Sequence, residues 1–215
     1  MDTRAGHEGL ARIARAKFEE ALKCGFAEVA LCWHRTMHLL RTFVRYNVWA
    51  TERLLASVAT LDDAVYHGHC GLPFRSIHGT LNHILLADKL LYSRLQPDAP
   101  EDPRLAPFWN RPDNELYAAP NAPSTYWEEF VPGRDAIAAE LVGQAKRLVA
   151  HVDTVPASDA RVAYRATDGV LKEKEAGYLI LHAVNHATHH RGQISASLTR
   201  LDVPPPTMDF SYFTP

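Results

Sequence analysis

Four long segments of the sequence repeat apolar residues at the three- and four-residue spacing of an α-helix. In the first segment, for example, Leu40, Phe43, Leu54 and Val58 fall on one stripe. The segments cover about 37–61, 76–95, 124–152 and 176–200. Helices with one apolar stripe must bury it, and several such helices bury their stripes against one another. The pattern therefore predicts an all-α fold, a four-helix bundle.

The connections between these segments carry their own signals. Proline cannot continue a helix, and the span 96–123 contains Pro97, Pro100, Pro103, Pro107, Pro112, Pro120 and Pro123. We therefore expect a long Pro-rich crossover between the second and third helices, whose Phe108, Trp109 and Tyr117 either cover a pocket mouth or pin the loop. Short alternating runs around Asp168-Gly169 predict a small β-hairpin before the fourth helix.

The ends of the segments are less regular. Ser76 is a plausible N-cap for the second helix. The third helix is expected from about Ser124, with Pro132-Gly133 either kinking it or marking its true start. We expect a loop over 62–73, and a tail over 201–215 that packs back over the end of the bundle.

Residues 1–36 precede the first strong pattern and form an N-terminal extension to the domain of residues 37–215. The stretch Leu10–Val29 has helical composition but a weak apolar face. One hypothesis is that Met37 is the native start and that the extension is not native. The other is that the extension is an extra helix packed on the outside.

The composition limits the possible partners. The chain has 23 Lys and Arg residues and 25 Asp and Glu residues, for a net charge of −2, which argues against a non-specific nucleic-acid binder. No apolar run approaches the roughly 20 residues of a membrane span, and no signal peptide is evident, so we expect a cytoplasmic protein. Cys24, Cys32 and Cys70 show no regular spacing, which favours free thiols over a metal site.

Histidines cluster on the fourth predicted helix. His182, His186 and His190 are four residues apart and therefore lie along one helical face. Two imidazoles at this spacing can bind one metal ion, although the zinc-protease motif H-E-x-x-H is absent. Leu179 and Ile194 continue the same face, which argues against a merely solvated histidine-rich surface.

A metal held by two histidines usually needs a third ligand from elsewhere. His83, in the apolar second helix, is the candidate, with His78 as its competitor; His67 and His69, on a loop, are more typical of a solvated pair. His83, His186 and His190 would leave a coordination position open, as in catalytic metal sites. We keep His182 as a reserve ligand, and Asn82 and Asn185 as possible hydrogen-bond partners of the ligands.

The sequence also resembles the DinB (DinB/YfiT-like) family. The resemblance rests on YNVWA at 46–50, SIHGTLNHI at 76–84, NHATHHRGQ at 185–193 and PPPTMDF at 204–210, in the expected order from about Met37 to the C-terminus. It implies a four-helix bundle with a metal held by three histidines, here His83, His186 and His190. It also implies a homodimer. Three imidazoles suit zinc, nickel, iron or copper.

The reaction is less constrained than the site. Better-understood relatives include transferases and isomerases that use low-molecular-weight thiols such as bacillithiol or mycothiol, so our first hypothesis is a thiol S-transferase-like enzyme acting on an electrophile. Arg191 either pairs with a substrate carboxylate or makes a structural contact. A metal-dependent hydrolase is the alternative, with Asp88 as the nearest candidate base, although its spacing from His83 points it elsewhere. The third hypothesis is a non-catalytic metal-binding stress-response protein.

Overall fold

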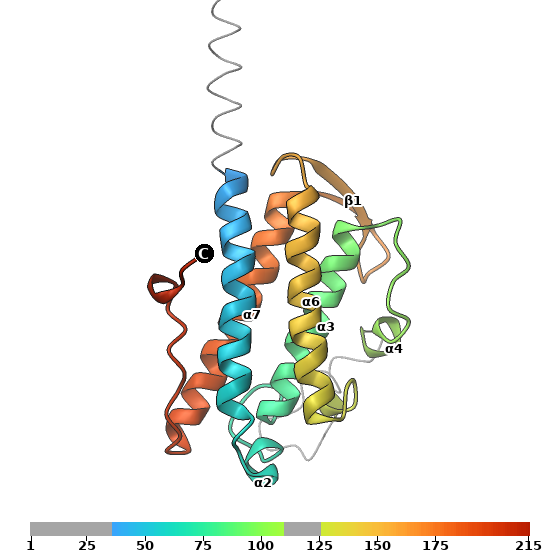
Figure 1. The fold of residues 1–215 in the computed structure, drawn as a ribbon. Coiled ribbons are helices and arrows are strands. Elements are labelled where there is room, and N and C mark those ends of the chain that lie inside the picture. The colour runs from blue at the N-terminus through green and yellow to red at the C-terminus, as the bar shows by residue number, and fades with distance from the viewer. Residues whose placement is uncertain (1–35, 110–125) are drawn as a thin grey trace, which may run out of the picture. The chain divides into compact units, whose positions relative to one another are not determined.

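The computed structural model describes residues 36–109 and 126–215, and residues 40–215 form one compact unit. The fold is mostly helical with one two-stranded antiparallel sheet, in agreement with the predicted class. Four long helices lie side by side in the described residues (Figure 1): the helix over 36–58, α3 (Ile77–Leu95), α6 (Arg134–Thr154) and α7 (Ala176–Arg200). Helix 36–58 and α7 run in one direction, and α3 and α6 run in the other.

The apolar stripes of these helices meet in one core. Leu54, Leu85, Ile137 and Ile194, one from each long helix, are almost completely buried. Within the described residues, none of the helices combines the length and the apolar character that crossing a membrane requires. The periodicity that predicted each helix therefore also identified the side that it buries.

The two central helices explain the long crossover. Because α3 and α6 run in the same direction, the chain must return along their length before α6 begins (Figure 1). The described parts of this crossover contain two short helices, α4 (Leu105–Trp109) and η1 (Tyr126–Glu128). The Tyr126 hydroxyl donates to the Phe108 carbonyl at 2.6 Å, which favours the pinning interpretation of Phe108. Tyr117 lies outside the described residues.

The predicted start of the second helix is confirmed, and the third helix starts at the later of its two predicted positions. Ser76 is the N-cap of α3, because its Oγ accepts a hydrogen bond from the Gly79 amide at 2.9 Å. The third long helix does not begin near Ser124, which itself lies outside the described residues. It begins at Arg134, directly after Pro132-Gly133, so this pair marks the true start. Proline has no backbone N–H to donate within a helix, so Pro132 is a natural boundary before α6.

The predicted hairpin is present. Strands β1 (Arg161–Arg165) and β2 (Leu171–Glu175) pair antiparallel around the Asp168-Gly169 turn. Gly169 has φ +77°, a conformation that glycine adopts at no steric cost. Tyr164 is the buried side chain of β1, and the Arg94 guanidinium of α3 lies over its ring. The hairpin thus packs against the helices, as an isolated hairpin must.

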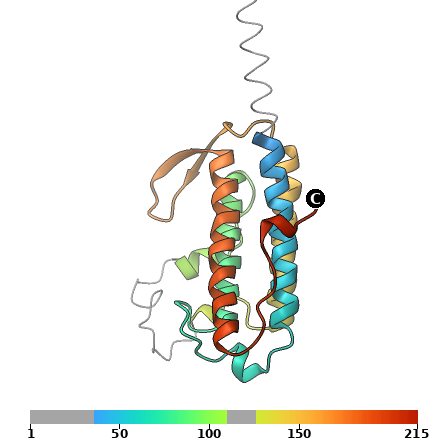
Figure 2. The same cartoon turned by 90° about the vertical axis from the view of Figure 1, so that its left-hand side faces the viewer.

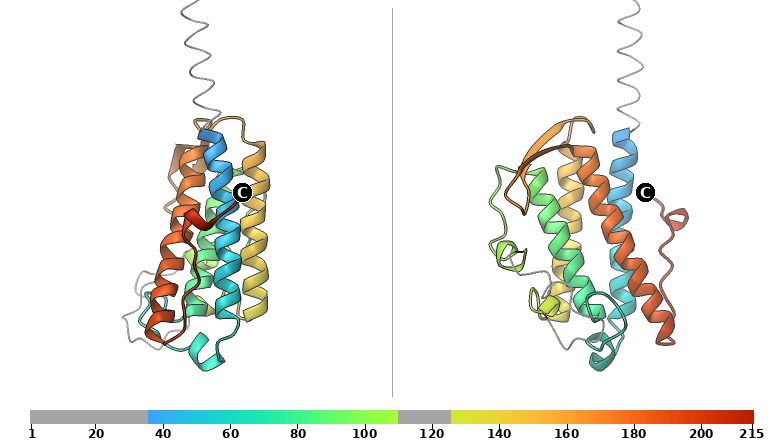
Figure 3. Two further views of the ribbon diagram at one scale, coloured as in Figure 1. Left: turned by 60° about the vertical axis from the view of Figure 1, so that its left-hand side comes forward. Right: turned by 180° about the vertical axis from the view of Figure 1, so that it is seen from behind.

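Two local expectations were wrong. The predicted loop over 62–73 contains a short helix, α2 (Asp63–Tyr66). The C-terminal tail runs along the side of helix 36–58 rather than over the end of the helices (Figures 2 and 3). The Tyr46 hydroxyl holds it by donating to the Met208 carbonyl, and Arg53 donates to the Thr207 carbonyl, both at 2.7 Å. The rings of Phe210 and Phe213 in the tail pack edge to face against the Tyr46 ring on helix 36–58, which draws the tail to this side.

The predictions for the N-terminal extension stay open. The stretch Leu10–Val29 and Cys24 and Cys32 lie outside the described residues. Cys70 is a free cysteine, as predicted.

Candidate metal centre

Three histidine side chains converge between α3 and α7, which pack against each other along much of their length. His83 comes from α3, and His186 and His190 come from successive turns of α7. The Nε2 atom of His186 lies 3.2 Å from that of His83 and 3.1 Å from that of His190. One helix thus supplies an i, i+4 pair and its neighbour supplies the third imidazole, as the spacing predicted.

These distances suit a metal ion. Zinc binds imidazole nitrogens at about 2.0–2.1 Å, and two nitrogens of a tetrahedral site are therefore about 3.3 Å apart. The ligand atoms of the three histidines all lie within 4.8 Å of one another, and in the described residues no other group of three or more potential ligands does so. The donor set and its spacing therefore fit a transition metal.

The protonation states suit it as well. Burial lowers the pKa of His83 to about 2 and that of His186 to about 3, with the neighbouring histidines adding to the effect. Burial also lowers the pKa of His190. Imidazole coordinates a metal only in its neutral form, so these shifts keep the cluster ready for a metal at neutral pH. His83 and His190 are only 6% and 7% exposed, whereas His186 is half-buried and forms the open edge.

Gln193, one turn beyond His190, orients this ligand. The Oε1 atom of Gln193 lies 2.8 Å from Nδ1 of His190 and can only accept a hydrogen bond. Nδ1 of His190 is therefore the protonated nitrogen, and the lone pair of its Nε2 points at the other histidines. His189 lies 3.1 Å from Nε2 of Gln193 and completes the chain. Such outer partners fix the tautomer of metal-binding histidines.

Two aromatic side chains enclose the buried side of the cluster. The Phe74 ring stacks on the His83 ring, with centroids 3.7 Å apart and planes 14° apart. The Trp127 ring meets both edge to face, with centroids 4.9 Å from each. The cluster therefore has an apolar wall on one side and half-buried His186 on the other.

Several residues that the sequence suggested for the site lie elsewhere. His182 is exposed on α7 and does not join the cluster. Asn185 is also exposed. The Asn82 side chain bonds to the backbone of His78 and Val131 rather than to any of the three clustered histidines. His78 is buried against the Tyr66 hydroxyl.

The two loop histidines also have partners within the protein. Nδ1 of His69 accepts a hydrogen bond from the Gly71 amide, and His67 contacts Glu128 rather than solvent alone.

Arg191 and Asp88 are both buried away from the cluster. Arg191, 2% exposed, donates to Asn47 and Thr51 of helix 36–58 and to Thr188, which supports the structural interpretation over substrate pairing. Asp88 is buried on α3, and burial raises its pKa to about 7 while Arg191 partly opposes the shift. Asp88 makes no hydrogen bond to the three histidines within the described residues.

A protein-family model matches most of the chain. The model of the DinB family matches residues 34–214, which is most of the chain. The chain belongs to the DinB family. No curated protein matches it in a sequence comparison, so the family model carries this assignment. Residues 185–193 are the most histidine-rich segment of the DinB resemblance. They contain His186 and His190 of the cluster and also Gln193.

Sequence reasoning did not find the wall or the orienting glutamine. Gln193 is three residues after His190, a spacing that places it on the same helical side, and this signal was available. Phe74 and Trp127 carried no such signal, because one lies in a loop and the other lies in η1 of the crossover.

Proposed function

We propose that this protein is a metal-dependent enzyme of the thiol S-transferase type, with His83, His186 and His190 as the metal ligands. The observation that carries the proposal is the convergence of three neutral Nε2 atoms at metal-binding distances. Three protein ligands leave a position open for an exogenous ligand, the usual arrangement of a catalytic site. The DinB family membership supports the same site. We further propose the four-helix bundle of the DinB/YfiT-like type as its scaffold.

The proposed reaction joins a small-molecule thiol to an electrophile. A divalent zinc, nickel or iron ion in the cluster would lower the pKa of a coordinated thiol, so that its proton leaves to solvent. The thiolate sulfur then bonds to the electrophilic atom, and the leaving group departs with the electron pair of the broken bond. Half-buried His186 marks the side from which both molecules enter, and Phe74 and Trp127 exclude water from the opposite side.

Cobalt substitution tests this assignment. Co²⁺ replaces the native metal, and absorption is recorded while candidate thiols are added. A thiolate-to-cobalt band that depends on His186 and not on His182 supports the proposal. A cobalt spectrum that no thiol in the panel alters contradicts the thiol assignment, even if the metal site itself is present.

The two other hypotheses make different predictions in the same experiment. A hydrolase would show ionisation of metal-bound water near pH 7 and hydrolysis of activated esters. Asp88 has a pKa suited to a general base, but its lack of a hydrogen bond to the histidines in the described residues makes hydrolysis the weaker candidate. A non-catalytic metal-binding protein would hold cobalt without any exchangeable ligand.

The homodimer expected from the DinB resemblance stays a proposal. Tyr178 and Leu181 on α7 are 54% and 49% exposed, and such large exposed apolar side chains on one helix favour an interface. We expect a dimer in sedimentation velocity and a shift toward monomer for Leu181→Glu. An unchanged mass would exclude this face from any dimer contact.

A further inference from the structure

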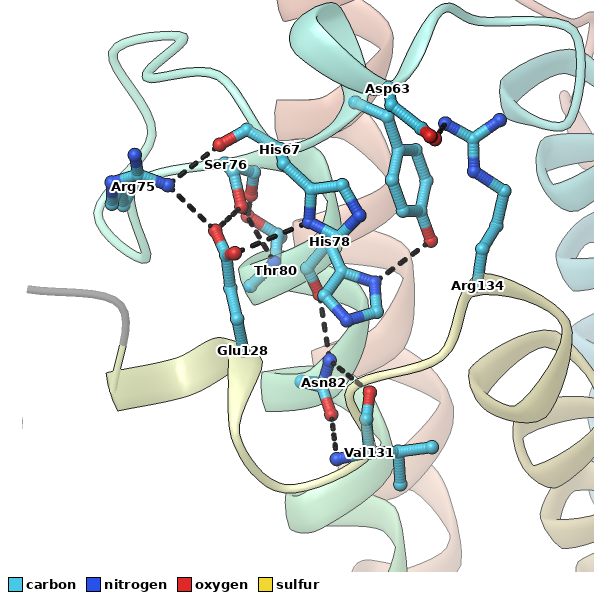
Figure 4. A network of polar contacts seen from close by, with 12 residues as sticks. Asp63, His67, Arg75, Ser76, His78, Thr80, Asn82, Glu128, Val131 and Arg134 are labelled. Atoms are coloured by element: carbon cyan, nitrogen blue, oxygen red, sulfur yellow. Dashed lines mark hydrogen bonds and ion pairs between the residues drawn. The ribbon is translucent and has the colours of Figure 1, made fainter.

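A network of polar side chains joins η1 to the loop that precedes α3 (Figure 4). Glu128 of η1 is its hub. Its Oε1 accepts hydrogen bonds from Arg75 at 2.8 Å and from Ser76, and its Oε2 lies 3.2 Å from Nδ1 of His67. Glu128 thus joins the crossover to the loop that precedes α3, two segments that are 52 residues apart.

Glu128 itself and two of its partners, Arg75 and Ser76, lie next to wall residues in the sequence. Arg75 and Ser76 directly follow Phe74, and Trp127 directly precedes Glu128. Phe74 stacks on His83, and Trp127 packs against both rings. The one carboxylate therefore ties together the two chain segments that carry the wall.

The backbone around Phe74 is held in an unusual conformation. Arg75 has φ +71°, a left-handed conformation that is unfavourable for a non-glycine residue. Its guanidinium donates to the His67 carbonyl as well as to Glu128. The Phe74 carbonyl lies so close to Gly79 that a Cβ there would approach it to 2.2 Å. The loop is thus packed tightly on the first turn of α3. The hydrogen bonds of the Arg75 side chain stabilise the left-handed backbone conformation of the same residue.

The segment of Trp127 is fixed at a second point. The Asn82 amide accepts from the Val131 N–H at 2.8 Å and lies 3.3 Å from the Val131 carbonyl oxygen (Figure 4). Asn82 directly precedes His83 on α3. The chain directly after Trp127 is therefore held at two points, Glu128 and Val131, by residues on or beside α3.

We propose that Glu128 is a positioning residue of the metal centre, which holds Phe74 and Trp127 against His83 through Arg75 and Ser76. This inference rests on the proposed function insofar as it assigns His83 as a ligand. Glu128 touches none of the three histidines in the described residues, so it acts through the wall. Without the network, the His83 imidazole loses the rings that fix its orientation and keep water from it.

The test uses the full chain without metal, so that it does not depend on metal binding. Aromatic rings shift the NMR signals of nearby protons, and a stacked ring at 3.7 Å moves the His83 ring protons well upfield. Glu128→Ala should return these protons most of the way toward ordinary histidine positions. Glu128→Gln keeps an oxygen that accepts from Arg75 and Ser76, and should preserve most of the shift. Glu52→Ala breaks an exposed ion pair with Lys146 and is the matched control.

A second readout uses metal-loaded protein. Glu128→Ala should weaken cobalt binding roughly tenfold, because the His83 imidazole is no longer held in its orientation, and should alter the cobalt spectrum, whereas Glu52→Ala should change neither. A folded Glu128→Ala variant whose His83 protons match those of the control overturns the inference, even if its melting temperature is lower. If Glu128→Ala does not fold, Arg75→Lys takes its place, because it keeps the charge but loses the guanidinium that bridges His67 and Glu128. Failure of the wild type to bind metal would refute the proposed function, whereas the metal-free NMR result would still decide the role of Glu128.

Discussion

The Arg191 guanidinium donates a hydrogen bond of 2.5 Å to the Asn47 side chain, 144 positions earlier in the chain. Arg191 directly follows His190, and Asn47 lies on helix 36–58, so the contact fixes the rotation of α7 about its axis. That rotation turns His186 and His190 toward His83. A buried structural contact thus sets the direction of two candidate metal ligands.

Removing the Asn47 side of this contact should destabilise the protein. Asn47→Ala leaves a buried charged donor with only longer contacts on that helix, to Thr51 Oγ1 at 3.3 Å and to the Tyr46 ring, and we expect a loss of about 2 kcal/mol in the free energy of unfolding. Asn47→Asp keeps an acceptor and should stay closer to the wild type. Urea denaturation measures both, and equal stability of Asn47→Ala and wild type would refute this role.

Gln193 should affect metal affinity rather than folding. Gln193→Leu removes the acceptor of the His190 Nδ1 proton, and we expect metal binding to weaken by about 10- to 100-fold. Gln193→Glu retains the acceptor and should bind nearly as tightly as the wild type. Competition against a chromophoric chelator gives the dissociation constants. If the leucine variant bound metal as tightly as the wild type, Gln193 would have no orienting role.

His78 should make the metal-free fold sensitive to acid. Burial, with the nearby His67 adding to it, lowers the pKa of His78 to about 4, whereas the unfolded chain titrates at the ordinary value of 6.5. The stability that neutral His78 provides is therefore complete above pH 6.5 and falls as the pH drops toward 4. The full loss is up to about 3 kcal/mol.

Denaturant unfolding at a series of pH values checks this dependence. The histidine cluster contributes in the same direction, so the comparison is between wild type and His78→Gln. The variant should lose less stability between pH 6.5 and 4 than the wild type does. Parallel curves of unfolding free energy against pH for the two proteins would show that His78 has the same pKa in the folded and unfolded states.

Local patterns predicted the helices and the histidine cluster well, because both depend on spacing within one helix. Ser76 capped α3, and α7 occupies the residues expected for the fourth helix. His83 required the second helix to face the fourth; the predicted four-helix bundle suggested this pairing, and the DinB resemblance agreed with it. The roles of Glu128 and Trp127 depend on contacts between segments far apart in the sequence, and no local spacing reveals such contacts. The predicted role of Asn82 beside the metal ligands was wrong for the same reason: its partner Val131 lies after the crossover, far from Asn82 in the sequence.

The most direct test of the central claim is the metal content of protein purified without chelators or affinity metal. His186→Ala and His83→Ala each remove a member of the cluster. His182→Ala, one turn away on the same helix, is the matched control. The three-histidine centre predicts about one metal ion per chain in the wild type and in His182→Ala, and a loss in the other two variants. A wild type without metal, or a His186→Ala variant that keeps it in full, would contradict the claim.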